Sequence, residues 1–303
     1  MLLEQGHKVV GIDNLNDYYD VRLKKYRLAE LKKHKNFTFI KTDIEFLSPL
    51  VQIFKKFKPD GVINLAARAG VRYSMENPFV YLSTNAGGTL NILEACREFK
   101  VKKVVLASTS SLYAGQKMPF KGSLPVNAPI SPYAASKKSA EAMCYTYHHL
   151  YAMDVTILRY FTVYGPAGRP DMSPFRFIKW IDEGTPVTLY GDGSQSRDFT
   201  YVDDIARGTI QSLSLKGFQV VNLGSNRPFK LSTFIELIEK NLGKKAKLKH
   251  YPKNITDMDA TWADVAQARK LLKWKADVTL EDGLGRTIDW YKQNKKWVSK
   301  IYV

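Results

Sequence analysis

The sequence has 303 residues, 45% of them hydrophobic, so the chain can bury a large core as one or two closely joined domains. Its formal net charge is +17, but the 46 Lys and Arg residues are spread over many segments without a nucleic-acid-binding motif, so we expect solvated helix faces that attract anionic substrates and no nucleic-acid partner. No run approaches the ~20 apolar residues of a membrane span, no signal peptide is visible and the two cysteines lack metal-site spacing, so we expect a cytoplasmic protein with free thiols, no membrane partner and no metal.

Short apolar runs alternate with segments of helical length in the first half of the chain. Strands are predicted at residues 7–13, 36–40, 61–66, 104–108 and 155–159, with a helix at 88–99. Apolar strands that alternate with helices favour a parallel sheet covered on both faces. Right-handed crossovers then predict the α/β class: a doubly wound, Rossmann-like sheet.

Turn residues become frequent after about Gly165, followed by helical patterns at residues 231–242 and 280–294. This change indicates a smaller α+β region over the carboxyl edge of the sheet, where ligands bind in open α/β folds. The predicted division has a sheet domain from residues 1–164 with 198–224, and a substrate-binding region from 165–197 and 225–303.

Two groups of polar residues suggest chemistry at that edge. Tyr133 and Lys137 follow Ser131-Pro132, a helix-start signal, and four-residue spacing places them on one helix face. A nearby ammonium favours the phenolate form of a tyrosine, which suits Tyr133 to proton transfer. The hydroxyl cluster Thr109-Ser110-Ser111 ends the strand predicted at 104–108. Each pattern has a structural explanation, two surface residues of a helix and a strand-capping turn, but their combination in this order is more specific.

Four stretches, at residues 107–113, 133–137, 159–166 and 197–204, resemble the extended short-chain dehydrogenase/reductase family. Within it, residues 13–20, 161–166 and 168–172 are most similar to nucleotide-sugar epimerases that act on UDP-glucuronate. The resemblance implies that the sheet domain binds NAD and that carbon 4 of a UDP-sugar is epimerised through a 4-keto intermediate, from UDP-glucuronate to UDP-galacturonate. It also implies a homodimer, through helices near Asn91 and Tyr145.

The same resemblance assigns the site residues. Tyr133 would take the proton of the sugar's 4-hydroxyl, Thr109 would hydrogen-bond that hydroxyl, and Lys137 would bind the nicotinamide ribose and lower the Tyr133 pKa. The implied cofactor-binding residues are Asp13, Asn14, Asp43, Ile44, Ala66, Ala67, Asn85, Ser108, Tyr133, Lys137 and Tyr160. The implied substrate-binding residues are Arg72, Ser110, Ser111, Thr162, Arg169, Tyr190, Arg197 and Asp257. Among these, Arg169 can form a two-bond fork with a uronate carboxylate, although a loop arginine in water is the alternative.

One departure concerns the glycine-rich phosphate loop, which the fold places ~20 residues before the acidic ribose ligand. Counting back from Asp13 puts that loop before Met1. We therefore expect an N-terminally truncated NAD-binding domain that lacks its first strand and binds NAD weakly. Two alternative functions remain open beside a UDP-glucuronate epimerase: an epimerase of the UDP-glucose type, or a catalytically inactive, truncated binder.

Overall fold

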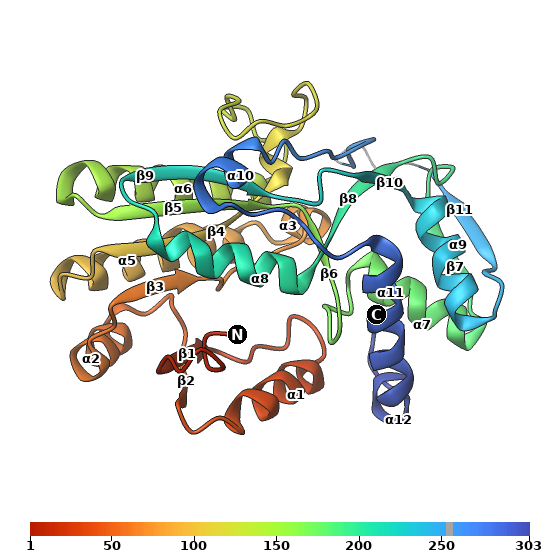
Figure 1. The fold of residues 1–303 in the computed structure, drawn as a ribbon, viewed down its shortest axis with the longest axis horizontal. Coiled ribbons are helices and arrows are strands. Elements are labelled where there is room, and N and C mark those ends of the chain that lie inside the picture. Colours follow the sequence, from red (N-terminus) through yellow and green to blue (C-terminus); the bar gives the residue numbers. More distant parts are fainter. Residues whose placement is uncertain (253–256) are drawn as a thin grey trace.

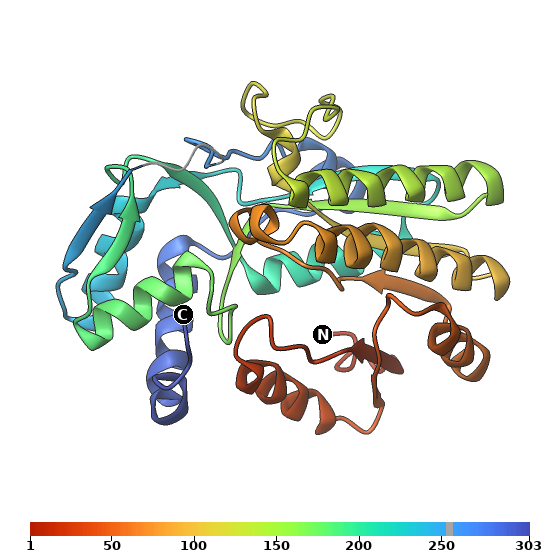
Figure 2. The same ribbon diagram turned by 180° about the vertical axis from the view of Figure 1, so that it is seen from behind.

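The computed structural model describes residues 1–252 and 257–303. Its centre is a parallel sheet in the order β3-β4-β5-β9, and these strands span Gly61–Asn64, Lys103–Thr109, Asp154–Tyr160 and Phe218–Leu223. Helices α5 (Gly88–Glu98) and α6 (Pro132–Tyr151) cover one face (Figure 2). Helices α8 (Val202–Gln211) and α10 (Ala266–Leu272) cover the other (Figure 1). This arrangement confirms the predicted doubly wound α/β class.

Strand β4 shows why the chain folds this way. All seven of its residues are buried, and its Val-Val-Leu run suits a strand that is covered on both faces. Helix α6 begins where the sequence predicted, because the Ser131 hydroxyl accepts a hydrogen bond from the Ala134 amide (3.2 Å) and Pro132 occupies the first turn. Both cysteines, Cys96 and Cys144, are buried free thiols, as expected.

The N-terminal unit is a separate two-stranded sheet. Strands β1 (Val9–Asp13) and β2 (Phe37–Lys41) pair in parallel and are joined by α1 (Val21–Lys32). In Figure 1 the unit lies below β3, to which α2 (Leu47–Phe57) connects it. Within residues 1–252 and 257–303, neither the second edge of β1 nor that of β3 pairs with a strand. The strands of this unit are consequently only half-buried.

The predicted α+β region forms a second lobe. Its three-stranded sheet, β10-β8-β6, spans Pro228–Lys230, Ser196–Tyr201 and Thr162–Tyr164, and a second pair joins β7 (Val187–Tyr190) to β11 (Leu248–Tyr251). Its helices are α7 (Ser173–Glu183), α9 (Leu231–Leu242), α11 (Leu280–Gln293) and α12 (Lys295–Val298). The rings of Phe199 and Phe234 stack at 4.2 Å in its core.

Three segments differ from the predicted division: β6 and most of β8 fall within 1–164 and 198–224 but belong to the second lobe, and α10 is the third. Helix α10 falls within 225–303, yet Ala268, Leu272 and the neighbouring Trp274 pack in one core with Val221 and Leu223 of β9. That part of the chain therefore belongs to the covering of the central sheet.

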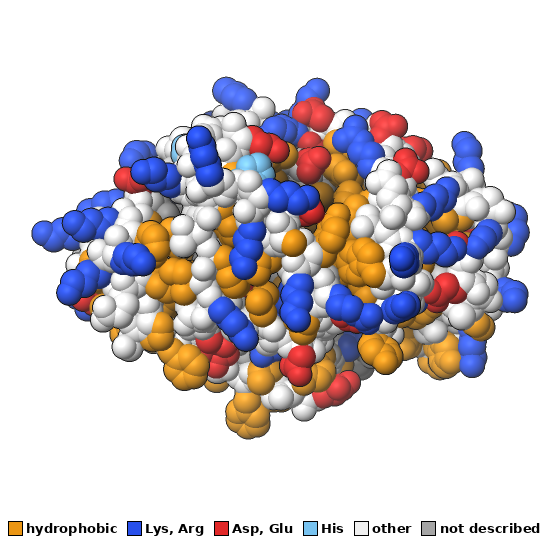
Figure 3. All heavy atoms as spheres, turned by 90° about the horizontal axis from the view of Figure 1, so that it is seen from below, with side chains coloured by type: hydrophobic (Ala, Val, Ile, Leu, Met, Phe, Trp, Pro, Cys, Tyr) orange, Lys and Arg blue, Asp and Glu red, His pale blue; other side chains and the backbone are white. Residues whose placement is uncertain are grey.

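The excess positive charge is dispersed. Figure 3 shows Lys and Arg side chains scattered over the face seen from below Figure 1, with hydrophobic side chains between them. In the part of the chain that the structure describes, no helix is long and apolar enough to cross a membrane. The same residues contain no group of three or more side chains arranged to hold a metal ion.

Candidate active site

The predicted catalytic residues meet at the carboxyl end of β4. Thr109 is the last residue of that strand, and Tyr133 and Lys137 occupy the first turns of α6. All three side chains are buried, with Lys137 only 4% exposed. The Thr109 hydroxyl lies close enough to the Tyr133 hydroxyl to favour its phenolate form. Lys137 donates from Nζ to the backbone oxygen of Ala107 (2.8 Å), two residues before Thr109.

The electrostatics of Tyr133 differ in part from the expectation. Burial raises the pKa of Tyr133, while the Thr109 hydroxyl and the positive charge of Arg169 act to lower it. The sequence led us to expect this charge from Lys137. In the structure Arg169 supplies it, because the Lys137 ammonium is directed to the Ala107 oxygen. Burial lowers the pKa of Lys137 to about 8, and the charge of Glu141 opposes that decrease.

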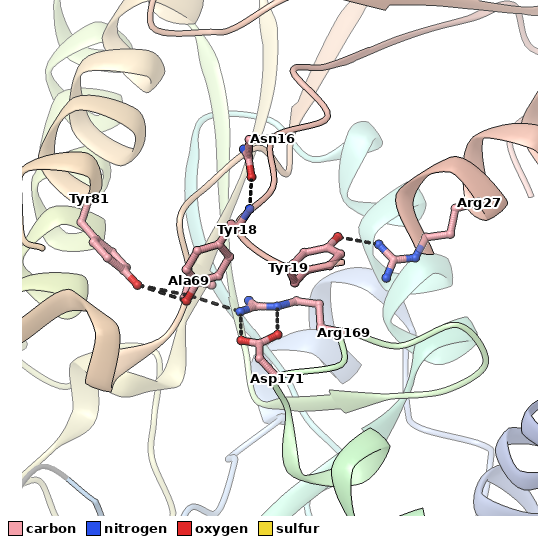
Figure 4. A network of polar contacts seen from close by, with 8 residues as sticks. All are labelled: Asn16, Tyr18, Tyr19, Arg27, Ala69, Tyr81, Arg169 and Asp171. Atoms are coloured by element: carbon pink, nitrogen blue, oxygen red, sulfur yellow. Dashed lines mark hydrogen bonds and ion pairs between the residues drawn. The ribbon is translucent and has the colours of Figure 1, made fainter. Parts of the chain in front are cut away.

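Arg169 joins three parts of the molecule, as Figure 4 shows. Its guanidinium donates from Nε and Nη2 to the two carboxylate oxygens of Asp171 (3.1 and 2.5 Å), and from Nη2 to the backbone oxygen of Ala69 (3.2 Å). The Tyr18 hydroxyl donates to the same Ala69 oxygen (2.7 Å), and the guanidinium lies over the Tyr18 ring (5.6 Å). Arg169 is therefore a mostly buried cation that hydrogen bonds fix close to Tyr133, and it is not a solvent-exposed loop arginine.

A pocket of about 240 Å³ lies between β1, β2 and the segment after β3. It contains most of the predicted residues for the adenosine end of the cofactor: Asp13, Asn14, Asp43, Ile44, Ala66 and Ala67. The Asp13 side chain is 51% exposed, so its carboxylate can accept from ribose hydroxyls. Arg68 lines the same pocket with a buried Nε that has no hydrogen-bond partner among the described residues, and a phosphate oxygen would satisfy it. These residues fit a dinucleotide.

A second group of predicted residues gathers at the other end of the site. The Arg72 guanidinium pairs with Asp257 (2.6 Å) and lies over the Tyr190 ring at 3.8 Å. Arg197 is nearby, because the charges of Arg72 and Asp257 both act on it. Burial lowers the pKa of Arg197. Two half-buried arginines beside an aromatic ring are suited to a nucleoside diphosphate.

Three predicted cofactor residues have other roles in the structure. The Ser108 hydroxyl points away from the site, since it donates to Glu141 (2.6 Å). The Tyr160 hydroxyl pairs with Thr209 of α8 (2.8 Å), on the opposite face of the sheet from α6. The Asn85 amide bonds the backbone of Arg68 and the Ser136 hydroxyl, so it holds the segment after β3 against α6. Each was implied by the family resemblance, which matches positions along the chain and does not specify the direction of a side chain.

The three remaining predicted residues lie near Thr109 or in the second lobe. Ser110 and Ser111 begin the 3₁₀ turn Ser110–Tyr113, whose Ser111 amide donates to the Thr109 hydroxyl (3.1 Å). Thr162 is half-buried at the start of β6, two residues beyond the end of β5.

Three residues of the site were not predicted: Tyr18, Arg68 and Asp171. Tyr18 and Asp171 lie within stretches that carried the family resemblance, residues 13–20 and 168–172, but no pattern in those stretches assigned them a role. The contacts of Tyr18 with Ala69 and Arg169 join segments far apart in the chain, and Asp171 fixes the Arg169 guanidinium from two residues away.

The comparisons with known proteins agree with this geometry. Residues 1–224 match the NAD dependent epimerase/dehydratase family, and the chain belongs to that family. A UDP-glucuronate 4-epimerase of Thermodesulfobacterium geofontis is 54% identical over 303 residues, which cover 100% of this chain and 94% of that protein.

Two solved structures are similar along nearly the whole chain. UDP-glucuronic acid 4-epimerase from Bacillus cereus, in complex with UDP-glucuronic acid and NAD, is 36% identical with a TM-score of 0.92, and the match covers 97% of this chain and 93% of that one. UDP-glucose 4-epimerase from Thermotoga maritima, with UDP-glucose, is 28% identical with a TM-score of 0.88 and covers 97% and 94%.

Proposed function

We propose that this protein is an isomerase that inverts carbon 4 of a UDP-uronic acid, interconverting UDP-glucuronate and UDP-galacturonate with NAD as a bound cofactor. The observation that carries the proposal is the position of a buried Tyr133, beside the Thr109 hydroxyl and within reach of the positive charge of Arg169. The 54% identity to a UDP-glucuronate 4-epimerase over the whole chain supports it.

The side chains divide the reaction between them. Tyr133 removes the proton from the 4-hydroxyl and later returns it, and Thr109 orients that hydroxyl. The Arg169 charge favours the phenolate that this step requires. NAD supplies the acceptor and donor of hydride at carbon 4 when it is bound. Burial of the residues around Tyr133 excludes water, which would otherwise compete for the proton.

The two ends of the substrate are recognised by different groups. Arg72, Tyr190 and Arg197 bind the UDP portion, with Asp257 holding Arg72 in place. Arg169 reads the carboxylate at the sugar end, and Ser110, Ser111 and Thr162 supply further hydroxyl donors to it. Asp13, Asn14, Asp43 and the small residues Ala66 and Ala67 hold the adenosine end of NAD.

Incubation of the purified protein with NAD and either UDP-glucuronate or UDP-glucose, followed by anion-exchange separation of the sugars, tests the proposal. We expect UDP-galacturonate to form, with little turnover of UDP-glucose. Equal turnover of both sugars would assign the protein to the UDP-glucose type. Absence of turnover and of NAD binding would indicate an inactive binder.

We also propose that the protein is a cytoplasmic homodimer. Helices α5 and α6 lie side by side on one face of the sheet (Figure 2). Exposed apolar side chains occur just before α5, at Phe79 and Leu82, and on α6, at Tyr145 and Leu150. The contact is predicted near Asn91 of α5 and Tyr145 of α6, and the Tyr145 side chain is 55% exposed. Light scattering during gel filtration would give the molar mass, and a monomer would reject this proposal.

A further inference from the structure

A buried ion pair lies directly beneath the catalytic residues. Glu141 of α6 and Arg159 of β5 have side chains only 5% and 4% exposed. Arg159 donates from Nε and Nη2 to the two carboxylate oxygens of Glu141, at 2.9 and 2.7 Å. A pair of this kind is costly to desolvate, so its contribution to stability alone is a weak reason for its presence.

The pair is placed to act on Lys137. Lys137 and Glu141 are four residues apart on α6, so their side chains emerge as neighbours on one helix face. They bond to consecutive residues of β4: the Lys137 ammonium to the Ala107 oxygen, and the Glu141 carboxylate to the Ser108 hydroxyl. The next residue along β4 is Thr109.

Strand β5 completes the arrangement. Ser108 and Arg159 are partners in the β4–β5 register, and Glu141 bridges their side chains. Arg159 also donates a hydrogen bond from Nη1 to the hydroxyl of Tyr113 (3.0 Å), the last residue of the 3₁₀ turn that follows Thr109. Glu141 thus connects helix α6 to both strands at the level where the catalytic groups emerge.

We propose that Glu141 is a positioning residue for the catalytic site: by binding Ser108 of β4 and Arg159 of β5, its carboxylate fixes α6, and with it the Lys137 ammonium, against the end of β4. This inference rests on the proposed function, in which Lys137 binds the cofactor's ribose.

The charged groups around Lys137 are consistent with this role. Burial acts to remove the proton of Lys137, and the negative charge of Glu141 opposes that effect. Cys144, one turn further along α6, contributes no stable charge because burial raises its thiol pKa well above the usual range. Its neighbour from α5, Cys96, is likewise a neutral thiol, with a pKa raised to about 12. Strand β5 contributes the Arg159 guanidinium, which Glu141 binds directly. The 3₁₀ turn contributes the Tyr113 hydroxyl, whose pKa is raised by burial.

The direction of the pH effect follows. The ammonium of Lys137 is present below its pKa of about 8 and is lost as the pH rises through that value. Loss of the Glu141 charge would lower this pKa further, so the charged form would disappear at a lower pH.

The test compares Glu141→Gln with the wild type by two readouts. The first is the titration of the Lys137 side chain, followed by NMR in protein with ¹³C-labelled lysine and assigned with Lys137→Arg. The second is the pH profile of kcat with saturating NAD and UDP-glucuronate. We expect Glu141→Gln to move the Lys137 midpoint and the alkaline limb of kcat to lower pH by about one pH unit or more, with KM for the sugar within about twofold.

Two further variants control the result. Glu183→Gln removes the carboxylate of another partly buried pair, that of Lys179 on α7, and should leave both readouts unchanged. Glu141→Gln combined with Arg159→Met leaves no lone buried charge, so it should fold even where the single variant does not.

The double variant also identifies the source of the effect. If it retains the shifted midpoint, the Glu141 carboxylate is responsible. Because Arg159→Met also removes a positive charge, it can offset part of the shift in the double variant, so the single variant decides: a Lys137 midpoint that does not move in Glu141→Gln would overturn the inference. Absence of epimerisation by the wild type would reject the proposed function, and the Lys137 titration would still decide the role of Glu141.

Discussion

The two halves of the candidate site are built in different ways. The catalytic half stands on β4, whose seven residues are all buried between α6 and α8. The cofactor half stands on β1, where no residue is fully buried. There, hydrogen bonds close to the strand end set the local shape. The Leu15 backbone N–H donates to Asp13 (2.6 Å), and the Asn14 side-chain amide donates to Asp43 (2.6 Å). Core packing therefore positions the groups that transfer the proton, whereas hydrogen-bonded loops form the adenosine pocket.

Arg169 connects the two halves. It comes from the second lobe, acts on Tyr133 in the catalytic half, and contacts Tyr18 and Ala69 on the cofactor side (Figure 4). A change at Arg169 should therefore affect the sugar specificity without removing either half.

The largest expected effect separates chemistry from cofactor binding. Tyr133→Phe should lower kcat by ~10²- to 10⁴-fold, because the group that transfers the proton is lost. NAD affinity, measured by isothermal titration, should stay within about threefold, since the adenosine pocket is built from other strands. A parallel collapse of NAD binding would show that the two halves are not independent.

Core substitutions should sharpen the same contrast in stability. Leu106→Ala on β4 should lower the free energy of unfolding by ~2–5 kcal/mol, because it leaves a cavity in a closed core. Val10→Ala on β1 should cost about 1 kcal/mol or less, since that side chain is only partly buried. Urea denaturation measures both, and equal losses would contradict the difference in packing.

The role of Arg169 between the two halves is tested by the specificity of the protein for the sugar. Arg169→Met should lower kcat/KM for UDP-glucuronate by ~10- to 100-fold, the loss expected for a charge-assisted hydrogen bond, with a smaller effect on UDP-glucose. The matched control is Arg72→Met, which should weaken both sugars alike because it contacts the UDP portion. Identical losses for both sugars in Arg169→Met would reject a carboxylate role.

The smallest effect concerns the ribose ligand. Asp13→Asn should weaken NAD binding by ~10-fold and narrow the preference for NAD over NADP, because the carboxylate accepts from ribose hydroxyls and repels a 2′-phosphate. At saturating NAD, kcat should be nearly unchanged. A large fall in kcat would mean that this loop also positions the catalytic half.

Much of the fold followed from local patterns. The helix of Tyr133 and Lys137 was predicted from Ser131-Pro132 and the apolar spacing that follows, and α6 starts there. The five predicted strands lie within one or two residues of β1 to β5, whose apolar runs are short and continuous, whereas β9 of the central sheet and the strands of the second lobe were not predicted. Local signals did less well where the chain folds back: α10 lies in the second part of the sequence, yet it packs on β9.

Strand and helix patterns in the sequence were enough to predict the class of the fold, and resemblance along the chain gave the family. The roles of Thr109, Tyr133, Lys137 and Arg169 were predicted from that resemblance, with the Tyr133–Lys137 spacing in support. Only the tertiary structure decided where their side chains point. It directed Ser108 and Tyr160 into internal hydrogen bonds, placed the Arg169 charge beside Tyr133, and set Glu141 between β4 and β5. The electrostatic field at a side chain and its burial depend on groups that are distant in sequence, because only the packed fold brings those groups within a few ångströms of it.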